Sequence, residues 1–404
     1  MSKRYQGGIL GVGFNPLQAP NAPTIGTATA GGNNCASVTF TAPANVGGSA
    51  ITGYTARSEP TGFGAAAAGS PITVTGLTNG SSYTFGAFAL NSYGPSPISA
   101  FSNSITAAVD GTFGIFALGN IGSGCTLVTT RDKYTYSGCA VSAGGAATTG
   151  SANGSAAGNS TVGIFALGYN TSYQFTTTRN KYTYVGCVVS AGGAATAASI
   201  SSSATGNSTV GIFALGQTNG NQFTTTRDKY TYSGCVVSAG GAATVASNSG
   251  SAAGNSTVGI FALGFVSGST WSTTRNKYTY SGCVVAAGGA ATAASRAGSA
   301  AGNSTVGIFA LGCVCPGSRA TTRNKYTYSG DVVSAGGAAT VASAFNSAAG
   351  NSTVGIFALG FTTTIVTTRN KYTYSGCVVS AGGAATAASR DGSAASNGII
   401  GVTL

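Results

Sequence analysis

The sequence predicts an all-β protein in two parts, a small β-sandwich followed by six repeated four-stranded sheets. Three observations lead to this fold class. Short runs of alternating apolar and polar residues, separated by Gly, Pro and Asn, fill residues 18–108. From residue 109 onward, a segment of about 48 residues recurs six times. No segment keeps the 3.6-residue apolar period and the capping residues of a helix.

The composition excludes several kinds of chemistry. The chain of 404 residues has no His, and only six residues are Asp or Glu. A Ser-His-Asp triad and a His-ligated zinc site are therefore impossible, and paired catalytic carboxylates or a carboxylate metal cage are disfavoured. Hydrophobic residues make up 43% of the chain, which argues against charge-driven disorder. We therefore predict a protein that is not an enzyme and that holds no cofactor and no metal.

Residues 1–17 are predicted to form a separate N-terminal arm. The opening is basic and then rich in Gly, without the apolar run of a secretory signal peptide. No stretch of about 18 apolar residues follows anywhere, so we expect synthesis in a cytoplasm and no membrane insertion. An arm of this length cannot build a core and is expected to order only against a partner.

Residues 18–108 carry the pattern of a sandwich of short strands. Its most specific stretch is Gly76-Leu77-Thr78-Asn79-Gly80, followed after two residues by Tyr83-Thr84-Phe85. This part resembles a fibronectin type III domain of the bacterial and phage type. The resemblance implies that Tyr83 takes the tyrosine-corner position and that Phe40 replaces the buried Trp of an early strand.

Residues 109–404 contain the repeats. The phrase GIFALG and the phrase KYTY each occur six times, with copies 46 to 49 residues apart. Residues 392–402 read as the degraded start of a seventh copy. We expect this partial copy to supply a closing strand to the first repeat, which would remove a free sheet edge.

Each repeat reads as four strands, which in the second copy cover residues 155–157, 162–167, 177–184 and 187–190. Four strands in about 48 residues is the size of one blade of a β-propeller. The order of an apolar strand ending in Gly, a variable loop, a Tyr-containing strand and a small-residue link resembles kelch repeats. The resemblance implies a six-bladed kelch-like β-propeller, although the usual kelch Trp is missing. A stacked β-solenoid or an interwoven fibre shaft is the alternative, but shaft repeats are usually shorter.

Basic residues recur in every repeat as Arg-x-Lys, and these pairs supply twelve of the 18 Lys and Arg residues. In a propeller they would lie at one radius. One interpretation is an exposed basic ring that meets an acidic protein or an anionic glycan; the other is a set of stems packed between blades with their charged heads at the edge. Nucleic acid is disfavoured because the aromatic residues lie on the opposite strand face from the basic ones. The pairs are Arg131/Lys133, Arg179/Lys181, Arg227/Lys229, Arg275/Lys277, Arg323/Lys325 and Arg369/Lys371.

Binding is expected in the loops that differ between repeats, because variable loops on a constant scaffold usually carry recognition. These loops cover residues 120–127, 169–175, 217–223, 265–271, 313–319 and 361–366. The aromatic candidates in them are Tyr169, Tyr173, Phe223 and Trp271. The twelve KYTY tyrosines, by contrast, are predicted to pack between blades.

Five of the nine Cys residues share one repeat position, which Asp331 occupies in the fifth repeat. Equivalent positions in a repeat array usually cannot meet to form a disulfide, so these Cys residues are interpreted as small buried apolar side chains.

The arm, the fibronectin type III-like part and the repetitive Ala/Gly-rich remainder together resemble structural proteins of tailed bacteriophage virions, in particular fibre and appendage proteins. The resemblance implies a virion protein that is held by its arm and its fibronectin type III-like part to other virion proteins, as a homo-oligomer on the particle. Its propeller would contact a host surface glycan. The alternative is a capsid or tail decoration protein that binds other virion proteins through the basic ring. A propeller enzyme acting at Asp132 or Asp228 is the weakest hypothesis, because no carboxylate pair recurs in the repeats.

Overall fold

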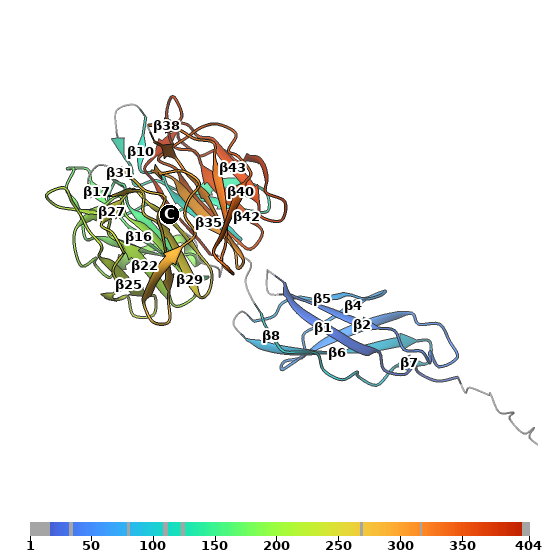
Figure 1. Cartoon of the computed structure of the whole chain (residues 1–404). Coiled ribbons are helices and arrows are strands. Elements are labelled where there is room, and N and C mark those ends of the chain that lie inside the picture. Colours follow the sequence, from blue (N-terminus) through green and yellow to red (C-terminus); the bar gives the residue numbers. More distant parts are fainter. Residues whose placement is uncertain are drawn as a thin grey trace, which may run out of the picture. The chain divides into compact units, whose positions relative to one another are not determined.

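The computed structural model describes residues 17–31, 35–78, 81–107, 112–122, 126–266, 270–315 and 317–397. The strands pair antiparallel, and the one helical segment in this part of the chain is a short 3-10 turn, Val185–Cys187. The prediction of an all-β protein is therefore confirmed. The chain divides into two compact units, Met1–Val109 and Asp110–Leu404 (Figure 1). None of the described segments forms a helix that could cross a membrane.

The first unit consists of two sheets with a shared apolar core. One sheet has the order β1 (Thr24–Gly31), β2 (Cys35–Thr41) and β5 (Ile72–Val74). The other has the order β4 (Gly64–Ala67), β3 (Gly53–Glu59), β6 (Ser82–Asn91) and β7 (Gly94–Pro95), with β8 (Ile105–Thr106) also paired to β6. Alternate residues of β3 and β6 are buried, as expected for strands with one face on a core.

Tyr83 links the core of this unit to the turn before β6. Its ring is buried beside Phe85, and its Oη accepts a hydrogen bond from the backbone N of Thr78 at 3.0 Å. This bond back to the chain five residues upstream is the interaction that the tyrosine-corner assignment implied.

The second unit contains six four-stranded sheets, each running from an inner to an outer strand. The first sheet is β46 (Ser393–Ser396), β9 (Phe113–Ala117), β12 (Arg131–Thr135) and β13 (Ala140–Ala143). The second is β15 (Ser155–Gly158), β16 (Val162–Ala166), β18 (Arg179–Thr183) and β19 (Val188–Gly192). The third is β21 (Ser203–Gly206), β22 (Val210–Ala214), β25 (Arg227–Thr231) and β26 (Val236–Ala239).

The other three sheets repeat this order. The fourth is β28 (Ser251–Gly254), β29 (Val258–Ala262), β32 (Arg275–Thr279) and β33 (Val284–Gly288). The fifth is β35 (Ser299–Gly302), β36 (Val306–Ala310), β39 (Arg323–Thr327) and β40 (Val332–Gly336). The sixth is β41 (Ser347–Gly350), β42 (Val354–Ala358), β43 (Arg369–Thr373) and β44 (Val378–Gly382).

The sequence of each inner strand explains its position. The Ser-Ala-Ala-Gly strand β15 is buried along its whole length, and its small side chains allow close approach to the inner strands of both neighbouring sheets. The turn into β16 is fixed by Asn159, whose Oδ1 accepts hydrogen bonds from the backbone N atoms of Thr161 and Val162 at 2.9 Å. The same Asn-Ser-Thr turn recurs at Asn207, Asn255, Asn303 and Asn351.

Gly163, the first residue of GIFALG, must lack a side chain. A Cβ there would lie 2.9 Å from Tyr184 Oη and 3.1 Å from the Cβ of Ala395 in the neighbouring inner strand. The Gly therefore allows tight packing between one sheet and the next.

The six sheets contact one another in cyclic order. The inner strands contact in the order β46, β15, β21, β28, β35, β41 and back to β46. Six apolar clusters fill the spaces between consecutive sheets, and the cluster between the last and first sheets joins Phe116, Tyr134 and Tyr136 to Val354 and Ile356. The KYTY tyrosines are buried in these clusters, so their predicted packing between sheets is confirmed.

The inner strand of the first sheet comes from the far end of the chain. β46 pairs with β9 in the register Ser393↔Ala117 to Ser396↔Gly114. This is the pairing that the sequence assigned to the partial seventh copy, and it gives the first sheet the same four strands as the others.

The outer strands begin later than predicted, because the preceding turn uses the shared Cys position. Cys187 has a φ of +54°, a left-handed conformation that a strand cannot contain. The five Cys residues are half-buried at these turns rather than buried as predicted, and all five carry free thiols.

Candidate binding face of the six-sheet unit

The variable loops and the small-residue links emerge at the same end of every sheet. In the second sheet, β16 ends at Ala166, which is paired with Ser155 at the start of β15 and with Arg179 at the start of β18. The loop after β16 and the link before β15 must therefore leave the sheet side by side. We call this end of the unit, with its six loops and six links, the variable face.

Short extra sheets attach the loops to the links. In the second sheet, β17 (Tyr169–Asn170) pairs with β14 (Ser151–Ala152). The corresponding sheets are β20 (Ser199–Ile200), β23 (Gln217–Thr218) and β24 (Gln222–Phe223); β27 (Ser247–Asn248), β30 (Phe265–Val266) and β31 (Thr270–Trp271); β34 (Ser295–Arg296), β37 (Cys313–Val314) and β38 (Ser318–Arg319); and β45 (Ser389–Arg390), β10 (Asn120–Ile121) and β11 (Thr126–Leu127). The sixth loop is attached by single bridges at Phe361.

The four aromatic candidates lie on the variable face in three consecutive sheets. Tyr173 is 66% exposed and stacks on Tyr169, with ring centroids 5.8 Å apart. Phe223 is half-buried against Phe265, whose strand partner in the same small sheet is Trp271. The structure thus brings the two tyrosines together, while Phe223 and Trp271 are both neighbours of Phe265.

Trp271 and Tyr169 each have a polar neighbour on this face. The Arg296 guanidinium lies over the Trp271 ring at 5.1 Å, and Asn120 Nδ2 donates to Tyr169 Oη at 3.1 Å. These contacts hold the two rings in place at the surface.

The six arginines of the Arg-x-Lys pairs are not exposed, so the prediction of a surface ring that includes them is wrong. Each has 1 to 2% of its surface accessible and lies between two sheets over a Phe ring of the next sheet. Their guanidinium groups do not lie at the edges of the sheets either, so the second interpretation is also wrong for the arginines. The six residues are Arg131, Arg179, Arg227, Arg275, Arg323 and Arg369.

Each of these arginines donates its Nη2 to the residue that follows the equivalent Arg in the next sheet. Arg179 reaches Asp228 at 2.7 Å, and Arg227 reaches Asn276 at 3.0 Å. The remaining bonds are Arg131 to Asn180, Arg275 to Asn324, Arg323 to Asn370 and Arg369 to Asp132. The last bond returns to the first sheet, so the six bonds form a closed circle.

The acceptor residues of this circle were missed in the sequence. The residue between Arg and Lys is Asn or Asp in all six repeats, and this restriction was the available signal. Asp132 and Asp228, named for the enzyme hypothesis, are fully buried and ion-paired to Arg369 and Arg179. Neither carboxylate is accessible to a substrate.

The six lysines are half-buried beside the same strands. Lys277 Nζ lies 2.9 Å from Asp331 Oδ1 in the next sheet, and Lys133 Nζ lies 4.2 Å from the centre of the Phe113 ring. Lys277 therefore takes part in a contact between sheets, whereas Lys133 packs on a residue of its own sheet. The others are Lys181, Lys229, Lys325 and Lys371.

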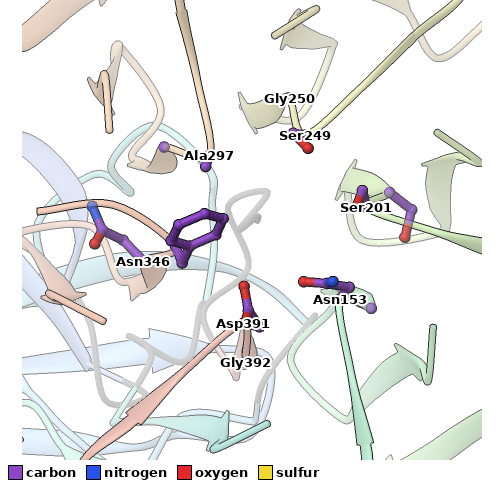
Figure 2. A pocket seen from close by; sticks show the side chains of 12 residues that line it. Asn153, Ser201, Ser249, Gly250, Ala297, Asn346, Asp391 and Gly392 are labelled. Atoms are coloured by element: carbon purple, nitrogen blue, oxygen red, sulfur yellow. The ribbon is translucent and has the colours of Figure 1, made fainter. Parts of the chain in front are cut away.

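At the centre of the variable face lies a hollow that offers about 520 Å³, including the solvent at its mouth. Figure 2 shows Asn153, Ser201, Ser249, Ala297 and Asp391 arranged around it. Phe345 completes the set, so each of the six links contributes one residue. We call these six residues the axial ring.

The backbone of the axial ring is closed by hydrogen bonds. Ser201 N donates to Asn153 O at 2.8 Å, Ser249 N to Ser201 O at 2.9 Å, and so on around the ring until Asn153 N donates to Asp391 O at 2.9 Å. All six residues have φ between +51° and +56°. This left-handed conformation is disfavoured for residues other than Gly, Asn and Asp.

Asp391 is the one titratable side chain among the described residues that line this hollow. Its carboxylate accepts a hydrogen bond from Asn120 Nδ2 at 3.2 Å and lies 3.4 Å from Arg390 Nε. Burial raises the pKa of Asp391 above its usual value, and the bond from Asn120 and the charge of Arg390 offset part of that effect.

The described residues contain no group of three His, Cys, Asp or Glu side chains that could hold a metal ion. Cys313 and Cys315 of the fifth loop are both free; Cys313 is buried, and burial raises the pKa of its thiol.

No protein-family model matches the chain, and no curated protein matches it. Among solved structures, a crystal structure of domains A168-A170 from titin matches with 26% identity and a TM-score of 0.21. The match covers 22% of this chain and 32% of the titin chain.

Proposed function

We propose that this chain is a displayed subunit of a tailed-phage virion, a fibre, spike or appendage protein, which contacts a host surface glycan through its variable face. In this proposal, residues 18–108 form a fibronectin type III-like domain and residues 109–404 form a six-bladed kelch-like β-propeller. The arm, residues 1–17, and the first domain attach the chain to other virion proteins as a homo-oligomer. Residues 1–16 lie outside the described part of the chain.

The propeller assignment is supported by the cyclic contacts of six four-stranded sheets and by the pairing of β46 with β9. The fibronectin type III-like assignment is supported by the two sheets around one core and by the bond between Tyr83 and Thr78. Both assignments concern the fold alone. The proposed function is therefore argued from the variable face.

One observation carries the functional proposal: the differences between repeats are concentrated on one face. The strand Val-Gly-Ile-Phe-Ala is the same in five sheets, and Arg-Asn/Asp-Lys-Tyr-Thr is the same in all six. The loops between these strands differ in every repeat and carry Tyr173, Trp271 and other aromatic side chains. A constant scaffold with one varied, aromatic-bearing face is the arrangement of a recognition surface.

A decoration role without receptor binding remains the second proposal, because of a different observation. Five equivalent Val residues on the outer strands are more than half exposed, namely Val188, Val236, Val284, Val332 and Val378. These apolar side chains lie along open sheet edges, which are suited to lateral contacts with other virion proteins. In this alternative the charged contacts come from the six half-buried lysines alone, because the arginines of the predicted basic ring are buried.

Labelling and competition test the two proposals. Gold-labelled antibodies against residues 110–404 should mark distal fibre tips on virions, and the purified chain should compete with virions for adsorption to host cells. Tyr173→Ala together with Trp271→Ala should abolish competition, whereas Val236→Ala with Val284→Ala should leave it intact. Label along the tail or over the head, without competition, would favour decoration. Virions without any label would overturn both.

A further inference from the structure

We propose that the hollow within the axial ring binds the terminal residue of an uncharged sugar chain, end-on. This inference rests on the proposed function, since it names the ligand class and the place at which a glycan would enter the variable face. The loops would then contact the following residues of the same glycan.

The backbone N–H groups of the axial ring offer no free donor to a ligand in the hollow. Each backbone N–H of the axial ring is already donated to the carbonyl of the preceding ring residue, at distances between 2.8 and 3.2 Å. A ligand therefore finds the ring N–H groups occupied, and the side chains of the six ring residues are what distinguish one ligand from another.

These side chains vary although the strands that follow them hardly do. The ring residues read Asn, Ser, Ser, Ala, Phe and Asp, while the four residues of the inner strands read Ser-Ala-Ala-Gly in four of six sheets. In the backbone conformation of these positions, Gly or Asn would cost least. Ala and Phe nevertheless occupy this conformation, at φ of +52° and +56°, and we infer that the side chain itself has a use there.

The order of side chains around the ring gives the hollow one polar side and one apolar side. Following the backbone bonds, Asp391, Asn153, Ser201 and Ser249 come in succession and form a polar arc. Ala297 and Phe345 complete the ring as an apolar arc, and Phe345 packs beside the cluster of Ala297, Cys313 and Ala344. A hexose has the matching division, with hydroxyl groups at its edge and C–H groups on its ring face that pack on an aromatic side chain.

The charge of the hollow selects the kind of sugar. Of the described residues that line it, one is a carboxylic acid, Asp391, and none is Lys or Arg. An anionic sugar would bring its carboxylate toward that of Asp391, and the one cation beside Asp391, Arg390, already lies 3.4 Å from the Asp391 carboxylate and does not line the hollow. The hollow is therefore suited to a neutral sugar, in contrast to the anionic glycan that an exposed basic ring would have favoured.

Saturation-transfer NMR with the full chain tests the ligand class. The probes are the methyl glycosides of glucose, galactose, mannose, N-acetylglucosamine and rhamnose, with glucuronic acid and N-acetylneuraminic acid as charged counterparts. We expect saturation of at least one neutral glycoside and of neither acid. Saturation of an acid in preference to every neutral sugar, or of no probe at all, would overturn the proposal.

A matched pair of variants then places the site. Phe345→Asn removes the aromatic surface and places at φ +56° a residue that tolerates the left-handed conformation, which offsets part of the packing lost beside Ala297, Cys313 and Ala344; a thermal melt of the variant checks the fold. Cys283→Asn makes the same kind of change at φ +52° in an outer turn that does not line the hollow. We expect roughly a tenfold or greater loss of glycoside affinity in the first variant. The second should match the unaltered chain; equal affinity in both would contradict the proposal.

The two proposals fail in different ways. If Phe345→Asn binds glycosides normally while Tyr173→Ala with Trp271→Ala abolishes adsorption, the end-on site is wrong and the function of the variable face stands. If glycosides bind in the hollow but the chain never competes with virions, the sugar site stands and the attachment role is wrong.

Discussion

At the scale of single residues, the buried circle of arginines is the feature that most distinguishes this fold. Four of the six arginines face an Asn and two face an Asp. Burial lowers the pKa of Arg131, Arg227, Arg275 and Arg323 to about 10. These four remain cationic at neutral pH, with cation–π contacts to Phe and Tyr rings in place of a carboxylate partner.

Placing a carboxylate opposite Arg227 should stabilise the unit. In Asn276→Asp the new carboxylate would accept from Arg227 and from Thr244, as Asp228 accepts from Arg179 and Thr196. A hydrogen bond between charged groups contributes more than a neutral one, so we expect a gain of about 1 kcal/mol in the free energy of unfolding. Urea unfolding of the chain at pH 7 measures it.

The reverse change provides the control. Asp228→Asn should give the third sheet the arrangement of the fourth and lose a similar free energy, because Arg179 would lose its one ion-pair partner. A loss in Asn276→Asp together with a gain in Asp228→Asn would mean that the cost of burying a carboxylate at these positions exceeds the gain from pairing.

The sequence predicted the burial of the tyrosines between the sheets but not that of the arginines. The burial of the KYTY tyrosines was predicted correctly because a large aromatic side chain at a repeated strand position has few alternatives to burial. The arginines were misplaced because a strand with alternating basic residues reads as half exposed. The pairing of each Arg with an Asn or Asp in the next sheet offsets part of the cost of burial, and that pairing joins residues 47 to 49 positions apart, or 237 positions apart at the closure.

At the scale of elements, β46 decides whether the first sheet has a free edge. Without it, β9 would expose the backbone groups that now pair with residues 393–396, and the cluster of Phe116 and Ala394 would open. Exposed strand edges promote association between chains.

A chain that ends at residue 391 should therefore aggregate or dimerise and unfold at a lower temperature. A chain that ends at Asn397 keeps β46 and the hydrogen bond from Phe113 N to Asn397 Oδ1, and it should behave as the full chain does. Size-exclusion chromatography with light scattering and a thermal melt compare the two. Equal melting temperatures would show that β46 is dispensable.

The strands could be predicted from the sequence, since internal repetition shows which positions are constrained. The residues at which the strands begin and end were predicted less accurately. The predicted fourth strand of the second sheet included Cys187, but its positive φ places it in the preceding turn. The axial ring was not predicted at all, because the links read only as small-residue connections. The varied residue in each link, from Asn153 to Asp391, was the signal that could have revealed it.

At the scale of the whole molecule, all candidate binding residues belong to one of the two units. The loops, the links and the axial ring lie within residues 110–404, and the first unit has a separate core built from residues such as Val38, Phe85 and Ile105. In the proposed function, binding and attachment therefore fall to different units. Units with separate cores generally unfold as separate cooperative transitions.

Fragments 17–109 and 110–404 should therefore fold separately and divide the functions between them. In differential scanning calorimetry, fragment 17–109 should melt within about 4 °C of its transition in the full chain and the longer fragment 110–404 within about 2 °C, shifts that correspond to about 1 kcal/mol of coupling. Fragment 110–404 should keep glycoside binding and competition for adsorption, whereas fragment 17–109 should keep neither. Incorporation into particles should require the arm and first unit. A larger shift would mean that the two cores stabilise each other, and binding by fragment 17–109 would move recognition away from the variable face.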